Sequence, residues 1–80
     1  MAKFELYTQV QLSKDLQNTI FKKGDIATIV EVIEQQNNTG YYLEFFDAAG
    51  NTIDIATAAE DELQKPVLHS VVNYRELVVA

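Results

Sequence analysis

The clearest pattern along this 80-residue chain is an alternation of apolar and polar residues with the period of two that β-strands have. Val, Ile, Phe, Tyr and Thr, the residue types that favour strands, make up 28 of its 80 residues. The first alternating stretch covers residues 7–12, where Val10 and Leu12 stand next to glutamines. Residues 13–19 are polar apart from Leu16 and predict a loop.

The longest predicted strand covers residues 26–35 and follows a tight turn that the pair Gly24-Asp25 indicates. Its alternation changes phase near Ile29 and Val30. A strongly bent strand with a β-bulge would produce that change and would serve both walls of a small barrel. A helix is the alternative, but the run of β-branched residues and the lack of a convincing cap argue against it.

The next predicted element is a hairpin. A turn at residues 37–40, where Asn and Gly can take positive φ, leads into a strand over residues 41–47. In that strand the alternation points Leu43 and Phe45 toward the core. The residues expected to face outward are Tyr42, Glu44 and Phe46.

A second hairpin follows directly. Residues 48–51 predict its turn, and residues 52–57 predict a strand that pairs back on the preceding one. The alternation in this strand predicts that Ile53 and Ile55 face inward and that Asp54 faces outward.

The last part of the chain is one helical turn and a C-terminal extension. Residues 60–63 predict the turn, anchored by Leu63. From about residue 67 the chain is rich in valine, which favours extended structure. A helix opened by Pro66 is the alternative. We therefore interpret residues 1–80 as one domain with this extension from about residue 67.

The charge narrows the choice of partners. The chain has 12 Asp and Glu against six Lys and Arg, a formal net charge of −6. A protein that binds nucleic acid or an anionic membrane surface needs clustered cations. The composition therefore predicts neither as a partner. The acidic excess either serves solubility or attracts a basic partner.

The residues that could carry chemistry are few. The chain has no cysteine, which excludes disulfides and thiolate sites. The single histidine, His69, adjoins Ser70, and neighbouring side chains on a strand point to opposite faces. Asp47 and Asp54 flank one hairpin, where Ala49 stands in a position that a calcium loop gives to an acid. We therefore expect no enzyme activity, no cofactor and no metal site.

The N-terminal residues lack the apolar segment of a signal peptide, and the longest apolar run is too short to span a bilayer. We therefore expect a cytoplasmic protein.

The order of these elements is that of an SH3-like barrel, and the chain more specifically resembles a small bacterial family, domain of unknown function 4926. The stretches that carry the resemblance are residues 5–7, 10–12, 14–16, 23–32 and 42–47, with Gly50. Ala27 stands where the family pattern usually has glycine. Because alanine disfavours positive φ, we expect an ordinary negative φ at this position.

The resemblance implies an all-β fold, a small SH3-like barrel of about five strands with one short helical turn. It also implies a non-enzymatic partner protein, because members look like small binding modules and some are encoded beside toxin-like proteins.

Two kinds of function follow from the sequence. The first is a small protein-binding module, in particular the regulatory or neutralising, antitoxin-like partner of a neighbouring gene product. Its contact residues would be Tyr42, Glu44, Phe46 and Asp54, although aromatic residues can also simply complete the core. The alternative is a structural subunit of a larger complex or a homo-oligomer. Residues 77–79 would then add as a strand to an edge, either of their own barrel or of a second copy, and the second case would give a homodimer.

One prediction follows from charge alone. Duplex DNA and RNA should bind weakly or not at all near physiological salt, because the six cations are dispersed along the chain. Fluorescence anisotropy with labelled duplexes at several salt concentrations measures this. Submicromolar affinity that falls steeply with added salt would contradict the prediction.

Overall fold

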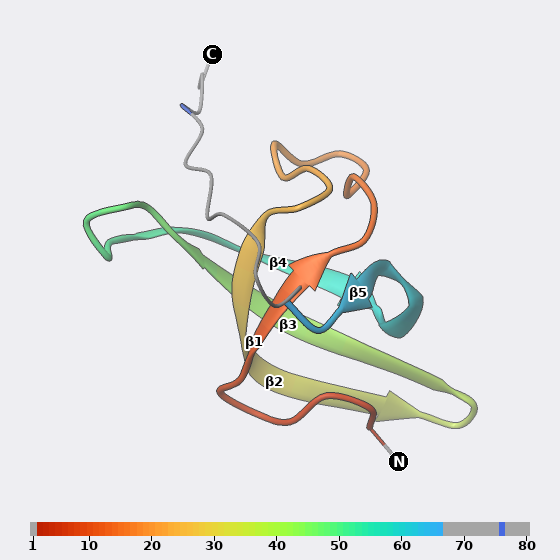
Figure 1. Cartoon of the computed structure of the whole chain (residues 1–80). Helices are drawn as coiled ribbons and strands as arrows, with labels where there is room; N and C mark the ends of the chain where they lie inside the picture. The colour runs from red at the N-terminus through yellow and green to blue at the C-terminus, as the bar shows by residue number, and fades with distance from the viewer. Residues whose placement is uncertain (1, 67–75, 77–80) are drawn as a thin grey trace.

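The computed structural model describes residues 2–66 and 76, and these form an all-β fold with one curled antiparallel sheet (Figure 1). The strand order in the sheet is β4-β3-β2-β1-β5. The elements are β1 Gln9–Leu12, β2 Ile26–Gln35, β3 Asn38–Phe46, β4 Thr52–Ala59, the 3-10 turn η1 Glu60–Glu62 and β5 Leu63–Gln64. This confirms the expected SH3-like arrangement of about five strands with one short helical turn.

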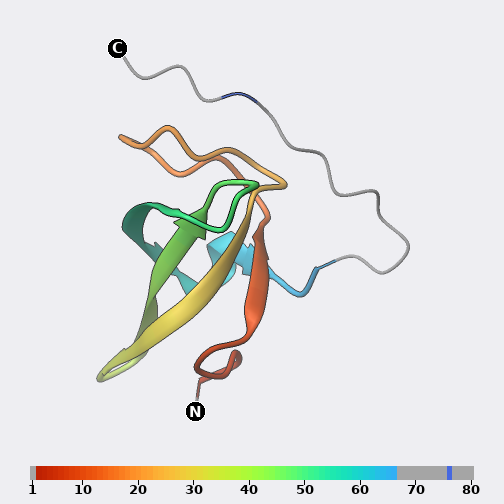
Figure 2. The same cartoon turned by 90° about the vertical axis from the view of Figure 1, so that its left-hand side faces the viewer.

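The sheet curls around a single apolar core (Figure 2). The loop between β1 and β2 closes the core, since two of its apolar residues, Leu16 and Phe21, are buried and the Leu16 N–H donates to the Phe21 carbonyl oxygen at 3.1 Å. The buried residues are Phe4, Val10, Leu12, Leu16, Phe21, Ala27, Ile29, Tyr41, Leu43, Phe45, Ala58 and Leu63. The curl therefore gives the sheet a filled inner face and an outer face.

The predicted bulge in the long strand is confirmed. Ile29 pairs with Leu43 and Glu31 pairs with Tyr42, so that Val30 is the extra residue between the two pairs. The extra residue shifts the inward-facing positions of β2 by one. The apolar residues before and after the bulge, which differ in phase in the sequence, can therefore face the same core. Ala27, the departure from the expected family pattern, lies buried in this strand opposite Val10.

The strand β3, which lies between β4 and β2, alternates as predicted. Leu43 and Phe45 are buried together with Tyr41, whereas Tyr42 and Phe46 are exposed on the opposite face. β3 pairs with β2 on one side and with β4 on the other over most of its length.

The prediction for β4 is confirmed for Ile53, which packs against the core, and is wrong for Ile55. Phe45 pairs with Asp54 but Phe46 pairs with Thr52, so Ile53 is an extra residue in a bulge. Beyond this bulge the alternation is shifted by one residue. Ile55 is therefore 53% exposed instead of buried, while the inward positions are taken by alanines, among them the buried Ala58.

Glycine takes the positive φ in two of the turns, at Gly24 and Gly50, whereas in the first hairpin turn Gln36 takes it in place of the predicted Asn or Gly. Gly24 (φ 95°) closes the turn before β2, where the Asp25 N–H donates to the Lys22 carbonyl oxygen at 3.0 Å. The first hairpin turn lies at residues 36–37, earlier than the predicted 37–40, because Gln35 already pairs with Asn38. The extended structure predicted for residues 67–80 and the edge pairing of residues 77–79 lie outside the described residues, apart from residue 76.

We expect Phe45→Ala to unfold most of the protein. The Phe45 side chain is 2% exposed and stacks on Phe21 with ring centroids 3.7 Å apart. Truncating such a residue costs about 3–5 kcal/mol, and small domains have about 5 kcal/mol in total. Thermal melting by circular dichroism measures the loss. Phe46→Ala is the matched control, since Phe46 is 43% exposed on the other face; equal losses for both variants would contradict the assignment of faces.

Candidate functional site

Three large apolar side chains gather on the outer face of the sheet. Tyr42 and Phe46 of β3 are 37% and 43% exposed, and Ile55 of the neighbouring β4 is 53% exposed. Ile55 pairs with Glu44, so Tyr42 and Phe46 are its two diagonal neighbours on β3. Diagonal neighbours on one face of a sheet lie within reach of large side chains. We call Tyr42, Phe46 and Ile55 the outer patch.

Glu44 stands at the centre of the outer patch. Its side chain is half-buried, and its Oε2 accepts a hydrogen bond from the Thr52 hydroxyl of β4 at 2.6 Å. This contact holds the carboxylate between the apolar side chains while its charge stays at the surface. The outer patch is therefore apolar with an acidic centre.

The sequence predicted three of the residues that the structure brings together here, and missed one. Tyr42, Glu44 and Phe46 share the outer face, but Asp54 pairs with the inward-facing Phe45 and so does not join them. Asp54 instead lies exposed on β4, where its Oδ1 accepts the N–H of Ile55 at 2.8 Å. Ile55 takes its place in the patch. The bulge at Ile53 places Ile55 on the outer face. No residue type in β4 predicts that bulge.

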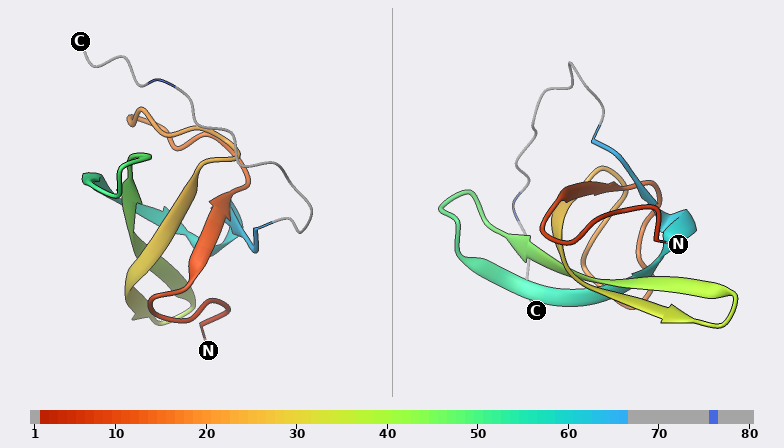
Figure 3. Two further views of the ribbon diagram at one scale, coloured as in Figure 1. Left: turned by 60° about the vertical axis from the view of Figure 1, so that its left-hand side comes forward. Right: turned by 90° about the horizontal axis from the view of Figure 1, so that it is seen from below.

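The remaining described elements leave the outer patch uncovered. Viewed from below, β1, the loop between β1 and β2, and η1 lie on the inner side of the β3–β4 pair (Figure 3). The outer side of that pair carries no other element among residues 2–66. The patch is thus accessible to a partner as far as the described chain is concerned.

The three long strands contain acidic residues and no basic ones, and two of the acids, Glu31 and Glu44, share the face of Tyr42. From Ile26 to Ala59 the chain has no lysine or arginine. The acidic residues of the same stretch are Glu31, Glu34, Glu44, Asp47 and Asp54. Glu31 is exposed and pairs with Tyr42, so its position borders the outer patch.

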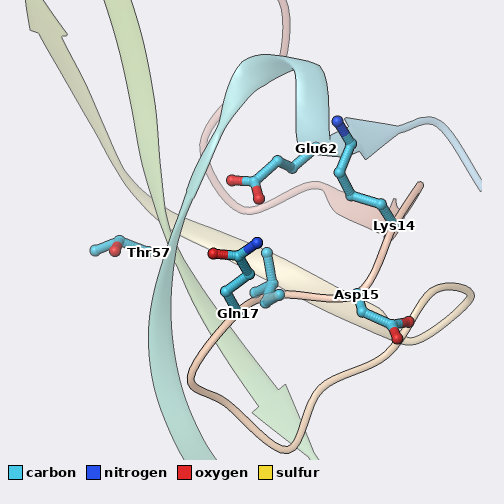
Figure 4. Close-up of a pocket in the computed structure, with 6 residues that line it drawn as sticks. Lys14, Asp15, Gln17, Thr57 and Glu62 are labelled. Carbon is cyan, nitrogen blue, oxygen red and sulfur yellow. The ribbon is translucent and has the colours of Figure 1, made fainter.

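A second surface feature is a shallow hollow between the β1–β2 loop and η1 (Figure 4). It is lined by Lys14, Asp15, Leu16, Gln17, Thr57 and Glu62. The Asp15 carboxylate is engaged elsewhere, because it accepts the Lys23 N–H at 2.8 Å and pairs with the Lys22 ammonium at 3.9 Å. Glu62 accepts the N–H of Ala59 at 2.8 Å. The polar groups of the hollow mainly hold the loop and η1 in place.

Ser13 and the acidic residues are the candidates for catalysis or metal binding that lie within the described part of the chain. Ser13 is bound through its hydroxyl to the Asp61 carbonyl oxygen at 3.3 Å, and His69 and Ser70 lie outside the described residues. Among residues 2–66 and 76, no three acidic or histidine side chains are grouped as a metal site would require. In the same part of the chain, no helix has the length and apolar character needed to cross a membrane.

The most strongly coupled titratable groups tie the N-terminal segment to η1. The hydroxyl of the buried Tyr41 donates to Glu60, and it accepts the N–H groups of Lys3 and Phe4 at 3.1 and 3.2 Å. Glu60 Oε2 also accepts the Lys3 N–H at 2.9 Å. Burial and the bond to Glu60 raise the pKa of Tyr41, while the bond from Tyr41 lowers the pKa of Glu60. This network stabilises the fold and lies on the inner side, away from the outer patch.

The comparison with family models identifies the chain. The family described as a domain of unknown function, DUF4926, matches residues 6–65. Because the match covers more than half of the 80 residues, the chain belongs to this family. No curated protein and no solved structure gives a significant match.

The Tyr41–Glu60 network predicts how stability depends on pH. Since the pKa of Glu60 is lowered from 4.5, its contribution is present above pH 4.5 and is lost as the pH falls through the lower, folded value. Since the pKa of Tyr41 is raised from 10.0, its contribution is present below pH 10.0 and is lost as the pH rises through the higher, folded value. Denaturant unfolding at a series of pH values measures both effects.

Two variants separate the network from the rest of the chain. Glu60→Gln should remove the part of the acid dependence that Glu60 contributes, and a profile parallel to that of the wild type would contradict its role. Tyr41→Phe leaves the buried Phe4 N–H without its partner and should cost about 1–3 kcal/mol at neutral pH.

Proposed function

We propose that this member of the DUF4926 family is a non-enzymatic protein-binding module whose contact surface is the outer patch. The observation that carries the proposal is the joint exposure of Tyr42, Phe46 and Ile55 on two neighbouring strands. Single exposed apolar side chains are common on folded proteins, but contiguous exposed groups of them mark interaction sites.

The kind of residue supports a protein partner. Aromatic side chains are enriched at the centres of protein interfaces, where they contribute much of the binding energy. Tyr42 and Phe46 offer such side chains from β3, a strand that is paired on both sides. A rigid strand presents them with little loss of conformational entropy on binding, which favours affinity.

The charge supports a basic partner. Glu44 lies at the centre of the patch, and the surrounding strands contain acids but no lysine or arginine. A partner with lysine or arginine near its apolar contact residues would be attracted to this surface and held in register by it. An acidic partner or nucleic acid would be repelled.

The proposed role of the module is regulatory. The partner would be the product of a neighbouring gene, whose activity the module regulates or neutralises by covering a basic surface. The small size of the chain fits a protein whose effect depends on occupying a surface.

The proposal is tested by recovering the partner with matched variants. The tagged full chain serves as bait in a lysate of the organism that encodes it, and captured proteins are quantified by mass spectrometry. Ile55→Ser should reduce recovery of the partner at least about tenfold, because it removes the most exposed apolar side chain of the patch.

Leu6→Ser is the matched control. Leu6 is 46% exposed but belongs to the segment before β1 instead of β3 or β4. It should leave recovery unchanged. Equal recovery with wild type, Ile55→Ser and Leu6→Ser would contradict the proposal, provided that all three melt at similar temperatures.

A further inference from the structure

The Glu44 carboxylate, at the centre of the outer patch, has one engaged oxygen and one open oxygen. Its Oε2 accepts the Thr52 hydroxyl at 2.6 Å, and this bond holds the side chain toward β4. Within residues 2–66, Oε1 has no hydrogen-bond or ion-pair partner. Both oxygens of an ionised carboxylate are acceptors, so Oε1 can accept a donor from another molecule.

The neighbours of this carboxylate on the outer face are mostly apolar. Tyr42 and Phe46 lie two residues before and after Glu44 on β3. Ile55 lies opposite Glu44 on β4, and Thr28 lies opposite it on β2. The apolar side chains on three sides displace water from Glu44, which is half-buried. A charge that is partly removed from water is stabilised when an opposite charge binds beside it.

The described part of the chain does not supply that opposite charge. There is no lysine or arginine between Ile26 and Ala59. The exposed Glu31, which pairs with Tyr42, instead places a second negative charge beside the patch. A cation that binds Glu44 therefore comes from a partner.

We propose that the outer patch binds one arginine side chain of its partner, whose guanidinium donates to Glu44 Oε1 and stacks on the ring of Tyr42 or Phe46. This inference rests on the proposed function and names the partner residue that the patch recognises. Residues two apart on a strand are separated by about 6.5–7 Å. Cations are attracted to an aromatic ring within about 6 Å of its centroid. A guanidinium bound to Glu44 is thus within reach of the ring on either side.

Arginine fits these surroundings better than lysine. The guanidinium group is planar, stacks on aromatic faces and is more weakly hydrated than an ammonium group. The lysine ammonium is a compact, strongly hydrated charge, so it loses more hydration between the side chains of Tyr42, Phe46 and Ile55. Charge alone attracts both residue types, and the apolar neighbours of Glu44 provide the preference for arginine.

The first experiment uses the full chain and a displayed library of random ten-residue peptides. Selection on the wild type, with depletion on Ile55→Ser, retains the peptides that need the outer patch. These peptides should share one arginine next to apolar residues, and arginine should be enriched over lysine at that position.

The second experiment tests the contact between the arginine and Glu44. In the most enriched peptide, citrulline replaces the arginine, because citrulline keeps the planar shape and lacks the charge. This change should weaken binding to the wild type at least about tenfold in fluorescence anisotropy, since hydrogen bonds to charged groups are strong. Lysine at the same position should weaken binding at least about threefold.

Glu44→Gln should weaken the arginine peptide at least about tenfold, and on this variant citrulline should cause little further loss, because the two changes remove the same contact. Glu5→Gln is the matched control. It removes the same charge from an exposed residue before β1 and should change affinity less than about twofold. Circular dichroism checks that both variants melt like the wild type.

The proposal is overturned if no peptide is enriched, or if lysine is enriched as often as arginine. It is also overturned if Glu44→Gln has no more effect than Glu5→Gln, or if the losses from Glu44→Gln and citrulline add in full. The proposed function is judged separately. A lysate partner that Ile55→Ser loses and Glu44→Gln retains would support the outer patch and contradict the arginine site.

Discussion

The alternation of β3 is the constraint on which the rest of this molecule depends. Tyr41, Leu43 and Phe45 fill the core from one face of the strand, and this fixes Tyr42, Glu44 and Phe46 on the other. A shift of one residue would place Glu44 in the core and three core residues in water, at a cost that a domain of 80 residues cannot meet. The exposed aromatic residues are thus a direct consequence of how the core is built.

Alternation and turn residues made most of the fold predictable. The bulge in β2 was visible because apolar residues on both sides of Val30 were out of phase. The bulge in β4 was not, since Ile53 and Ile55 keep an unbroken alternation in the sequence. Its position is set by long-range pairing with Phe45 and Phe46, where the Asp47 carboxylate fixes the turn by accepting the N–H groups of Ala49 and Asn51 at 3.0 and 2.9 Å. The candidate site was predicted to the same degree: its β3 residues were found, and its β4 residue was missed.

The two faces of the sheet divide the tasks of stability and contact. On the inner side, the Tyr41 hydroxyl satisfies backbone N–H groups of the N-terminal segment and is bound by Glu60 before β5. On the outer side, Ile55 and its diagonal neighbours combine apolar area with an acidic centre at Glu44. Substitutions on the outer side can therefore change binding while the core and its hydrogen bonds stay intact, which makes the proposed contact surface open to experiment.

Site-specific photo-crosslinking tests the contact surface most directly. A photoreactive benzoylphenylalanine at position 55, and separately at position 6, is irradiated in cells that contain the native partner. Both positions are exposed in the free chain, so a difference in crosslinking between them cannot come from accessibility alone. If the outer patch is the contact surface, the probe at position 55 should form a covalent adduct with one defined protein, and the probe at position 6 should form none. An adduct from position 6 with none from position 55, or the same adduct from both, would contradict it.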